Sequence, residues 1–189
     1  MCTLALDGKL YRAPLKEGIT KAVDIGCGTG IWAIDFADEF PECQVIGTDL
    51  SPIQPGWVPP NLEFQLDDAN EYWTWPDNTF DYIHMRAMFG SIVDWKALYQ
   101  EAFRCCKPGG YFEDYENSIK IDSDDGSVFP GSPFDQWTKV FWEGGSKFGR
   151  TFRVVEDDIQ KKYMEEAGFV DVTVWEFKVQ IRLSCNQPL

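Results

Sequence analysis

The segment from Val23 to Gly30 constrains the fold more than any other part of the chain. It reads Val-Asp-Ile-Gly-Cys-Gly-Thr-Gly, an apolar strand end with one acidic residue that runs into three glycines on alternate positions. Glycine lets a backbone turn sharply and come close to a ligand. Apolar residues then recur at helical spacing, at Ala33, Phe36, Ala37 and Phe40. The pattern predicts a strand, a glycine loop and a helix over 30–40.

A second acidic residue stands where the next strand is expected to end. Asp49 follows Gly30 by 19 residues and comes directly after the apolar run 44–48. A carboxylate at that position can accept hydrogen bonds from two ribose hydroxyls. The glycine loop and Asp49 together predict a nucleoside site.

The spacing of the glycines discriminates between nucleoside ligands. A dinucleotide fingerprint requires G-x-G-x-x-G, whereas here the third glycine comes one residue early and Asp24 precedes the loop. A carboxylate there would repel phosphate and suits a ligand with a cationic amino-acid portion. This spacing argues against a nicotinamide oxidoreductase. Another nucleotide fold or a structural glycine turn stays open as an alternative.

The string D-x-G-x-G-x-G followed by an acidic second strand end resembles motif I of the class I S-adenosylmethionine-dependent methyltransferases. The resemblance implies an α/β, Rossmann-like fold with a mostly parallel sheet flanked by helices. It also implies S-adenosyl-L-methionine as the cofactor, with Asp24 at its amino-acid end. The residues that it assigns to cofactor binding in this part of the chain are Asp24, Gly26, Cys27, Gly28, Gly30, Asp49 and Leu50.

Three later strings extend the resemblance. Residues 64–69 resemble the end of the third strand, where the family places an acidic residue against the adenine amino group, which assigns Asp68 and Ala69. Residues 80–86 resemble the fourth strand, whose exit backbone contacts the methionine part of the cofactor, which assigns Met85 and Arg86. Residues 107–112 resemble the turn into strand five.

Shorter strings at 30–37, 76–78, 83–86 and 141–145 resemble the fungal LaeA-like methyltransferases of secondary metabolism. This resemblance implies methyl transfer to a small secondary metabolite or to a protein acceptor. The alternative that it leaves open is a catalytically weak, S-adenosylmethionine-binding regulatory module that acts through protein partners.

Periodicity places the remaining elements. Strands are expected near 22–26, 44–48, 62–66, 79–84, 110–115 and 170–179, and helices over 30–40, 94–106, 134–147 and 157–167. Alternating strands and helices indicate a parallel sheet. Asp94 is expected to cap the second helix, whose inward residues are Trp95, Leu98, Tyr99, Ala102 and Phe103. The connection over 73–78 has turn residues and no helical period.

Both ends differ from the family pattern, in which a longer segment precedes motif I and a helix and a seventh, antiparallel strand follow strand six. We expect one methyltransferase domain over 1–189, with a residual N-terminal cap over 1–20, a divergent tail over 180–189 and no seventh strand. Strand edges are prone to pair with other chains unless they are covered. The open edge of strand five therefore favours self-association. The alternatives are that strand six, over 170–179, moves inward and pairs in parallel with strand five, or that the edge stays open and the C-terminal region is unstable.

Composition limits the partners and the compartment. The net charge is −14 and basic residues do not cluster, so direct nucleic-acid binding is not expected. No apolar run approaches the ~20 residues that span a bilayer, which predicts an intracellular protein, cytoplasmic or nuclear. The six cysteines have no zinc or redox spacing and are expected to be reduced, with no metal bound.

The sequence assigns no catalytic residue, because an activated methyl donor chiefly requires alignment of the acceptor and exclusion of water. An acidic acceptor would need a base, and the candidates at the ends of strands four and five are His84, Asp114, Tyr115 and Glu116. The strand position of His84 favours a hydrogen-bonded core residue over a base. Phe141 and Trp142 could form an apolar wall for the acceptor, with core packing as the alternative.

Overall fold

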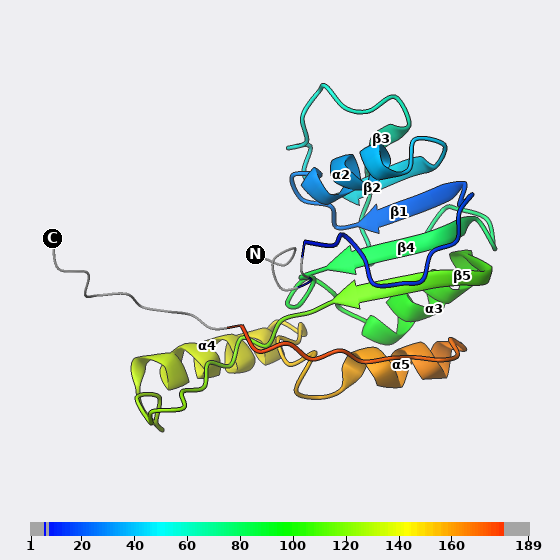
Figure 1. The fold of residues 1–189 in the computed structure, drawn as a ribbon. Helices are drawn as coiled ribbons and strands as arrows, with labels where there is room; N and C mark the ends of the chain where they lie inside the picture. Colours follow the sequence, from blue (N-terminus) through cyan, green and yellow to red (C-terminus); the bar gives the residue numbers. More distant parts are fainter. Residues whose placement is uncertain (1–5, 7, 180–189) are drawn as a thin grey trace, which may run out of the picture.

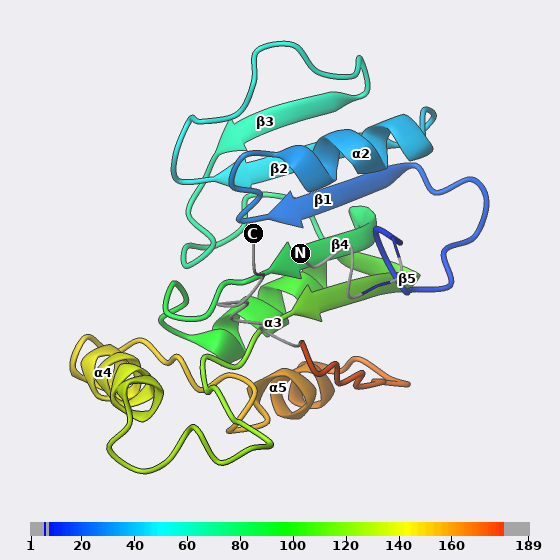
Figure 2. The same ribbon diagram turned by 60° about the vertical axis from the view of Figure 1, so that its left-hand side comes forward.

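A computed structural model describes residue 6 and residues 8–179. Its centre is a five-stranded, wholly parallel sheet in the order β3-β2-β1-β4-β5. The arrows of β1, β4 and β5 point the same way in Figure 1, and all five do so in Figure 2. The strands are β1 (Lys21–Ile25), β2 (Gln44–Asp49), β3 (Leu62–Leu66), β4 (Phe80–Arg86) and β5 (Cys106–Tyr115). The sequence-based prediction of a Rossmann-like α/β fold is confirmed.

Helices cover both faces of the sheet. The helices are α2 (Ile31–Glu39), α3 (Trp95–Cys105), α4 (Pro133–Lys147) and α5 (Ile159–Ala167). Figure 2 shows α2 in front of the sheet beside β1 and β2 and α3 behind it, and α3 packs against β5 and α5. In both ribbon views α4 lies away from the sheet.

The side chains on the two faces of the central strands belong to two separate hydrophobic cores. Val23 and Met85 belong to the core under α3, whereas Ala22 and Tyr82 belong to the core under α2. Strands that are buried on both faces lose the alternation of apolar and polar residues that a half-exposed strand shows. This explains why 22–25 and 82–85 are buried almost without interruption.

Helix α3 begins as predicted. The Asp94 side chain accepts a hydrogen bond from the Ala97 amide at 3.0 Å. The expectation that Phe103 points inward is wrong, because its side chain is 44% exposed. Phe103 lies at the rim of the buried stripe, where it packs edge-on against Phe169. The helix residues that are buried are Trp95, Leu98, Tyr99, Ala102 and Cys105.

Strand β5 begins earlier than the expected residue 110. The string at 107–110, which the sequence favours as a turn, lies inside the strand as an irregular start. The register between β4 and β5 shifts there between Phe80 and Tyr82, and Gly109 has a φ of +79°. A left-handed glycine inside a strand produces this kind of bulge, because glycine carries no Cβ.

The predicted sixth strand is wrong. Residues 170–179 form no strand, and within the described residues the sheet ends at β5. Their side chains are largely exposed, and instead of a strand partner Trp175 and Phe177 contact the Arg12 guanidinium, at 4.8 and 4.6 Å from the ring centroids. The predicted tail over 180–189 lies outside the described residues.

The last helix differs slightly from its prediction. It begins at Ile159, so that Asp157 and Asp158 precede it rather than occupy its first turn. Gly168 ends it with a φ of +115°, as expected for a helix C-cap.

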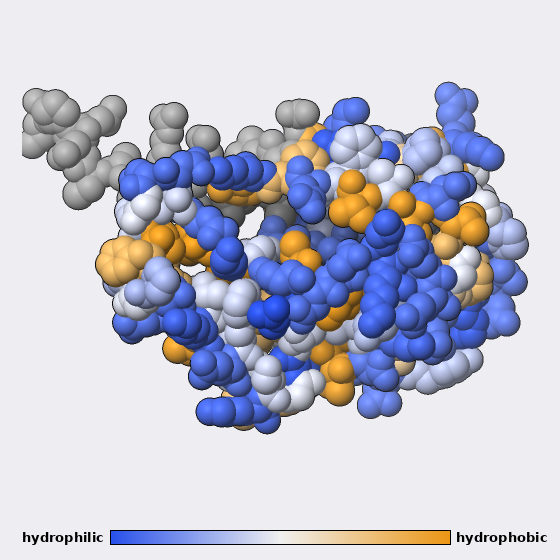
Figure 3. Space-filling model, turned by 90° about the horizontal axis from the view of Figure 1, so that it is seen from below, coloured by the Kyte–Doolittle hydropathy of each residue, from blue (hydrophilic) through white to orange (hydrophobic). Residues whose placement is uncertain are grey.

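The surface is rich in charge. Figure 3 shows the face seen from below as largely hydrophilic, with hydrophobic residues in scattered groups. Among the described residues, every helix is too short or too polar to cross a membrane.

Removal of the α3 cap tests how far this helix depends on its first turn. Replacing Asp94 by Ala leaves the Ala97 amide without its acceptor, and we expect the free energy of unfolding to fall by about 1 kcal/mol. Urea denaturation measures the change. Asp94→Asn keeps an acceptor oxygen and should lose much less; equal losses in the two variants would contradict a capping role.

Candidate functional site

The glycine loop between β1 and α2 is open to solvent at its middle glycine. Gly26, Gly28 and Gly30 all have left-handed backbone, with φ values of +66°, +56° and +76°. A Cβ at Gly26 would meet the Met88 sulfur at 2.3 Å, and one at Gly30 would meet the Phe64 ring at 2.2 Å, whereas one at Gly28 would meet nothing within 4 Å. The left-handed backbone favours glycine at all three positions, and Gly28 leaves room for a ligand to approach the backbone.

Asp49, at the end of β2, holds this loop. One carboxylate oxygen accepts from the Gly28 amide at 2.8 Å and the other accepts from the Ser51 amide at 2.9 Å. An ionised carboxylate offers about four acceptor positions, so roughly two remain. Two remaining positions match the two hydroxyls of a ribose. Leu50, the next residue, is 68% exposed beside them.

Asp24 lies beneath the loop and is paired with His84. Its Oδ1 is 2.7 Å from His84 Nδ1, and both side chains are buried. The His84 ring stacks on Trp32 at a centroid distance of 3.7 Å and an interplanar angle of 3°. This geometry agrees with the hydrogen-bonded core position favoured for His84.

Asp68 lies in the turn that follows β3. Its Oδ1 accepts from both the amide and the side-chain nitrogen of Asn70, each at 2.9 Å, and these hydrogen bonds hold the pKa of Asp68 below its ordinary value. Within the described residues no donor reaches Oδ2, which leaves an acceptor for an exocyclic amino group. Ala69 is partly buried against the core.

The end of β4 presents backbone rather than side chains. The Met85 side chain is 1% exposed in the core, so only its backbone could touch a ligand. Ala87 follows with a φ of +56°, which is rare for a residue with a Cβ, and its amide donates to the Tyr115 carbonyl at 2.9 Å. Sequence reasoning missed Met88, whose side chain covers Gly26, because no local pattern marks a contact between residues so far apart.

Part of the predicted N-terminal cap lies over β4 and β5. The Trp32 indole donates to the Leu10 carbonyl at 2.8 Å, and the Arg12 amide donates to Glu113 at 2.9 Å. Beneath this segment is a cavity of about 10 Å³, close to the space that one water molecule needs. It is lined by Leu6, Lys9, Leu10, Trp32, His84, Arg86 and Tyr115.

Two carboxyls at the end of β5 are buried side by side. Asp114 accepts from the Tyr99 hydroxyl at 2.6 Å, and Glu116 accepts from the amides of Met88 and Phe89 at 2.7 and 3.0 Å. Burial raises the pKa of both carboxyls, and the charge of Asp114 raises that of Glu116 further. Glu116 thereby fixes the turn that carries Met88. Burial also raises the pKa of Tyr115.

The aromatic residues of α4 pack against the chain that follows the helix. The Phe141 ring lies 5.2 Å from that of Phe152, and Trp142 lies under the Arg153 guanidinium at 4.3 Å. Phe152 in turn fills the space above Gly90. Phe141 therefore supports the turn after β4 from behind, which agrees with the packing alternative rather than with a wall for the acceptor.

The described cysteines are free thiols. Cys27 is half-buried in the glycine loop, while Cys43, Cys105 and Cys106 are buried. Burial raises the pKa of Cys27 to about 12, so this thiol stays protonated and unreactive. No group of three His, Cys, Asp or Glu residues suited to a metal occurs in the described part of the chain.

Comparison with known proteins places this arrangement in a family. A family profile described as a methyltransferase domain matches residues 4–174. A methyltransferase of Aspergillus terreus, pytC, is 36% identical over 180 residues, which are 95% of this chain and 55% of that protein. The secondary metabolism regulator LAE1 of Cochliobolus heterostrophus is 33% identical over 98% of this chain and 61% of its own length. The chain thus spans little more than half of these relatives.

Solved structures of methyltransferases share the fold of this chain. Phosphoethanolamine N-methyltransferase 2 of Haemonchus contortus, in complex with phosphomonomethylethanolamine and S-adenosylhomocysteine, superposes with a TM-score of 0.60 at 25% identity, over 84% of this chain and 35% of that one. A methyltransferase from Mesorhizobium loti shares the fold, with a TM-score of 0.64 at 22% identity, over 91% and 86% of the two chains.

The open glycine loop and the acceptor positions left on Asp49 and Asp68 suit S-adenosylhomocysteine, which the Haemonchus structure contains. The chain therefore belongs to the methyltransferase-domain family, with fungal LaeA-like proteins among its relatives, and its cofactor is S-adenosylmethionine.

Proposed function

We propose that this chain transfers a methyl group from S-adenosylmethionine to a small secondary metabolite or to a protein acceptor. The observation that carries the proposal is the pairing of an open backbone at Gly28 with an Asp49 carboxylate that has two acceptor positions left. When bound, the cofactor supplies an activated methyl group. The protein has to hold the cofactor, align an acceptor and exclude water.

The proposed cofactor contacts follow the edge of the sheet. Asp49 and Leu50 would hold the ribose, and Asp68 and Ala69 would hold the adenine. The amino-acid end would meet backbone groups of the glycine loop and of the β4 exit, with Asp24 supporting the loop from below. The residues on which this proposal rests are Asp24, Gly26, Cys27, Gly28, Gly30, Asp49, Leu50, Asp68, Ala69, Met85 and Arg86.

Three of the four candidate bases are engaged in hydrogen bonds in the described structure. His84 is stacked on Trp32 and paired, Asp114 is bonded to Tyr99, and Glu116 holds two amides. The Tyr115 hydroxyl is buried without a hydrogen-bond partner in the described residues. We infer that alignment of the acceptor, rather than proton removal, is the main contribution of the side chains.

The alternative is a regulatory module that binds the cofactor and transfers methyl groups slowly. It is favoured by the relatives named as secondary metabolism regulators. Incubation with methyl-labelled cofactor and a fungal extract separates the two functions, because label would enter solvent-extractable metabolites, precipitable protein, or neither. Label in neither fraction, with S-adenosylhomocysteine bound tightly, would favour the regulatory function.

Loss of the Asp49 carboxylate should weaken cofactor binding. Asp49→Ala removes the ribose acceptor and releases the Gly28 amide, and we expect the Kd for S-adenosylhomocysteine to rise about ten- to a hundredfold. Calorimetry measures it, with circular dichroism to confirm folding. The exposed Asp38→Ala is the charge-matched control and should bind normally. An unchanged Kd in Asp49→Ala would refute the ribose assignment, and no binding by the wild type would refute the proposed function.

The buried acid pair should make stability fall as the pH rises from acidic to alkaline. Because burial raises the folded-state pKa of Asp114, its contribution is fully present below the unfolded pKa of about 4 and is lost as the pH rises through the raised folded value. Asp114→Asn keeps an acceptor for Tyr99 and cannot ionise. The fall in Tm between about pH 5 and about pH 9 should therefore be smaller in Asp114→Asn than in the wild type. Asp38→Asn is the exposed control, and equal falls in all three proteins would refute the effect.

The second proposal is self-association through β5. The sheet ends at this strand within the described residues, and 170–179 do not pair with it. An uncovered edge strand offers amides and carbonyls to another chain. Because the net charge is −14, repulsion should oppose association at low ionic strength. Light scattering at tens of micromolar should show dimers that increase with salt; a monomer at all salt concentrations would contradict the proposal.

A further inference from the structure

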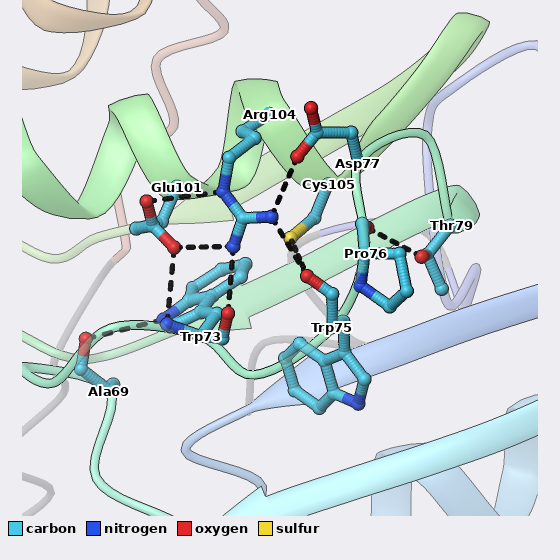
Figure 4. Close-up of polar contacts among 9 residues, drawn as sticks. All are labelled: Ala69, Trp73, Trp75, Pro76, Asp77, Thr79, Glu101, Arg104 and Cys105. Atoms are coloured by element: carbon cyan, nitrogen blue, oxygen red, sulfur yellow. Dashed lines mark hydrogen bonds and ion pairs between the residues drawn. The ribbon is translucent and has the colours of Figure 1, made fainter.

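Arg104, in the last turn of α3, is bound to the connection between β3 and β4. Figure 4 shows its guanidinium pointing into this connection from the helix. One nitrogen, Nη1, donates to the Trp75 carbonyl at 2.8 Å and to Asp77 at 2.9 Å. The other, Nη2, donates to the Trp73 carbonyl at 2.7 Å and to Glu101 at 2.6 Å. The planar fork of one guanidinium thus joins acceptor groups of four residues.

Glu101 binds the main chain of Trp73 together with Arg104. The same Glu101 oxygen that pairs with Arg104 accepts from the Trp73 amide at 3.1 Å, so both main-chain polar groups of Trp73 are bound by side chains of α3. The Trp73 side chain is 2% exposed. The Tyr72 ring stacks over the guanidinium at 4.6 Å. Hydrogen bonding to Glu101 raises the pKa of Arg104, which keeps the guanidinium charged.

We call the side chains of Arg104 and Glu101, which bind this connection, the clamp. The connection depends on the clamp because it has no regular secondary structure of its own. Residues 67–79 contain no helix or strand, so their carbonyls and amides lack the partners that a ladder would give. Main-chain groups that are shielded from water need partners from elsewhere. Arg104 and Glu101 supply them, and the helix fixes where the chain turns.

A short series of contacts leads from the clamp to the cofactor site. The Trp73 indole nitrogen donates to the Ala69 carbonyl at 3.4 Å, and the Glu71 amide donates to the Asp68 carbonyl at 3.0 Å. Asn70 binds the Asp68 carboxylate and also accepts from the Val93 amide at 2.8 Å. Residues 68–73 are therefore held at one end by α3 and at the other by their own turn.

We propose that Arg104 is a positioning residue for adenine recognition, which it controls from outside the site by holding residues 68–73. The proposal rests on the proposed assignment of Asp68 to the adenine amino group. Lysine at position 104 would keep the charge but could not engage the carbonyls of Trp73 and Trp75, Asp77 and Glu101 together. Asp68 would then lose its fixed place at the sheet edge.

Base selectivity separates this role from a merely structural one. S-inosylhomocysteine differs from S-adenosylhomocysteine in carrying an oxo group where adenine has its amino group. If Arg104 acts through Asp68, Arg104→Lys reduces the preference for the adenine ligand. A general loss of order or stability would instead weaken both ligands by the same factor.

The experiment measures Kd for both ligands by calorimetry in the wild type, Arg104→Lys, Asp68→Ala and the double variant. We expect Arg104→Lys to weaken S-adenosylhomocysteine about three- to tenfold and the inosine ligand less. In the Asp68→Ala background the same change should have little further effect on the ratio of the two Kd values. Arg153→Lys is the matched control, because Arg153 also pairs with a carboxylate and stacks on an indole, but lies on the surface beside α4.

Each other outcome refutes a defined part of this account. An unchanged ratio of Kd values in Arg104→Lys overturns the positioning role. Equal wild-type affinity for both ligands overturns the assignment of Asp68 and the positioning role with it, whereas no wild-type binding of either ligand overturns the proposed function itself. If Arg104→Lys does not fold, Glu101→Gln gives the same comparison, because it keeps an acceptor for the Trp73 amide while it weakens the pair with Arg104.

Discussion

The buried contact between Asp24 and His84 joins β1 to β4 at the point where the order of the sheet reverses. From β1 the chain moves outward to β2 and β3 and then returns to the other side of β1 as β4, which leaves a crevice at the carboxyl ends of these two strands. Asp24 precedes the glycine loop and His84 precedes the β4 exit, so this hydrogen bond adds a buried side-chain link between the two rims of the crevice to the main-chain pairing of β1 and β4. Trp32, stacked on His84, ties the first turn of α2 to the same point.

Around this crevice, three side chains with ionisable groups hold irregular loops by their main-chain groups. Asp49 binds the glycine loop, Glu116 binds the turn after β4, and Arg104 binds the connection after β3. Loops without a ladder need such partners, and the charged Arg104 guanidinium gives stronger hydrogen bonds than a neutral donor would. Several acidic residues of this acidic chain thus serve the backbone directly.

These contacts all hold loops at or beside the proposed cofactor site. Two further segments, the N-terminal residues near Leu10 and the exposed residues 170–179, lie outside the sheet. A cofactor site held in this way is compatible with both methyl transfer and a regulatory function. The partition of label between metabolite and protein distinguishes them.

Local sequence determined the glycine loop, the acidic end of β2, and the presence of the four helices and five strands of the described residues, because each depends on spacing within about ten to twenty residues. The tertiary structure alone decided that 170–179 form no strand, that Phe103 lies at the rim of its helix face and that residues 107–110 join β5 as a bulge. It also decided the contacts of Met88 with Gly26 and of Arg104 with Trp73. These contacts join residues that are far apart along the chain, so their geometry follows from how the helices pack on the sheet, and no periodicity in the sequence encodes it.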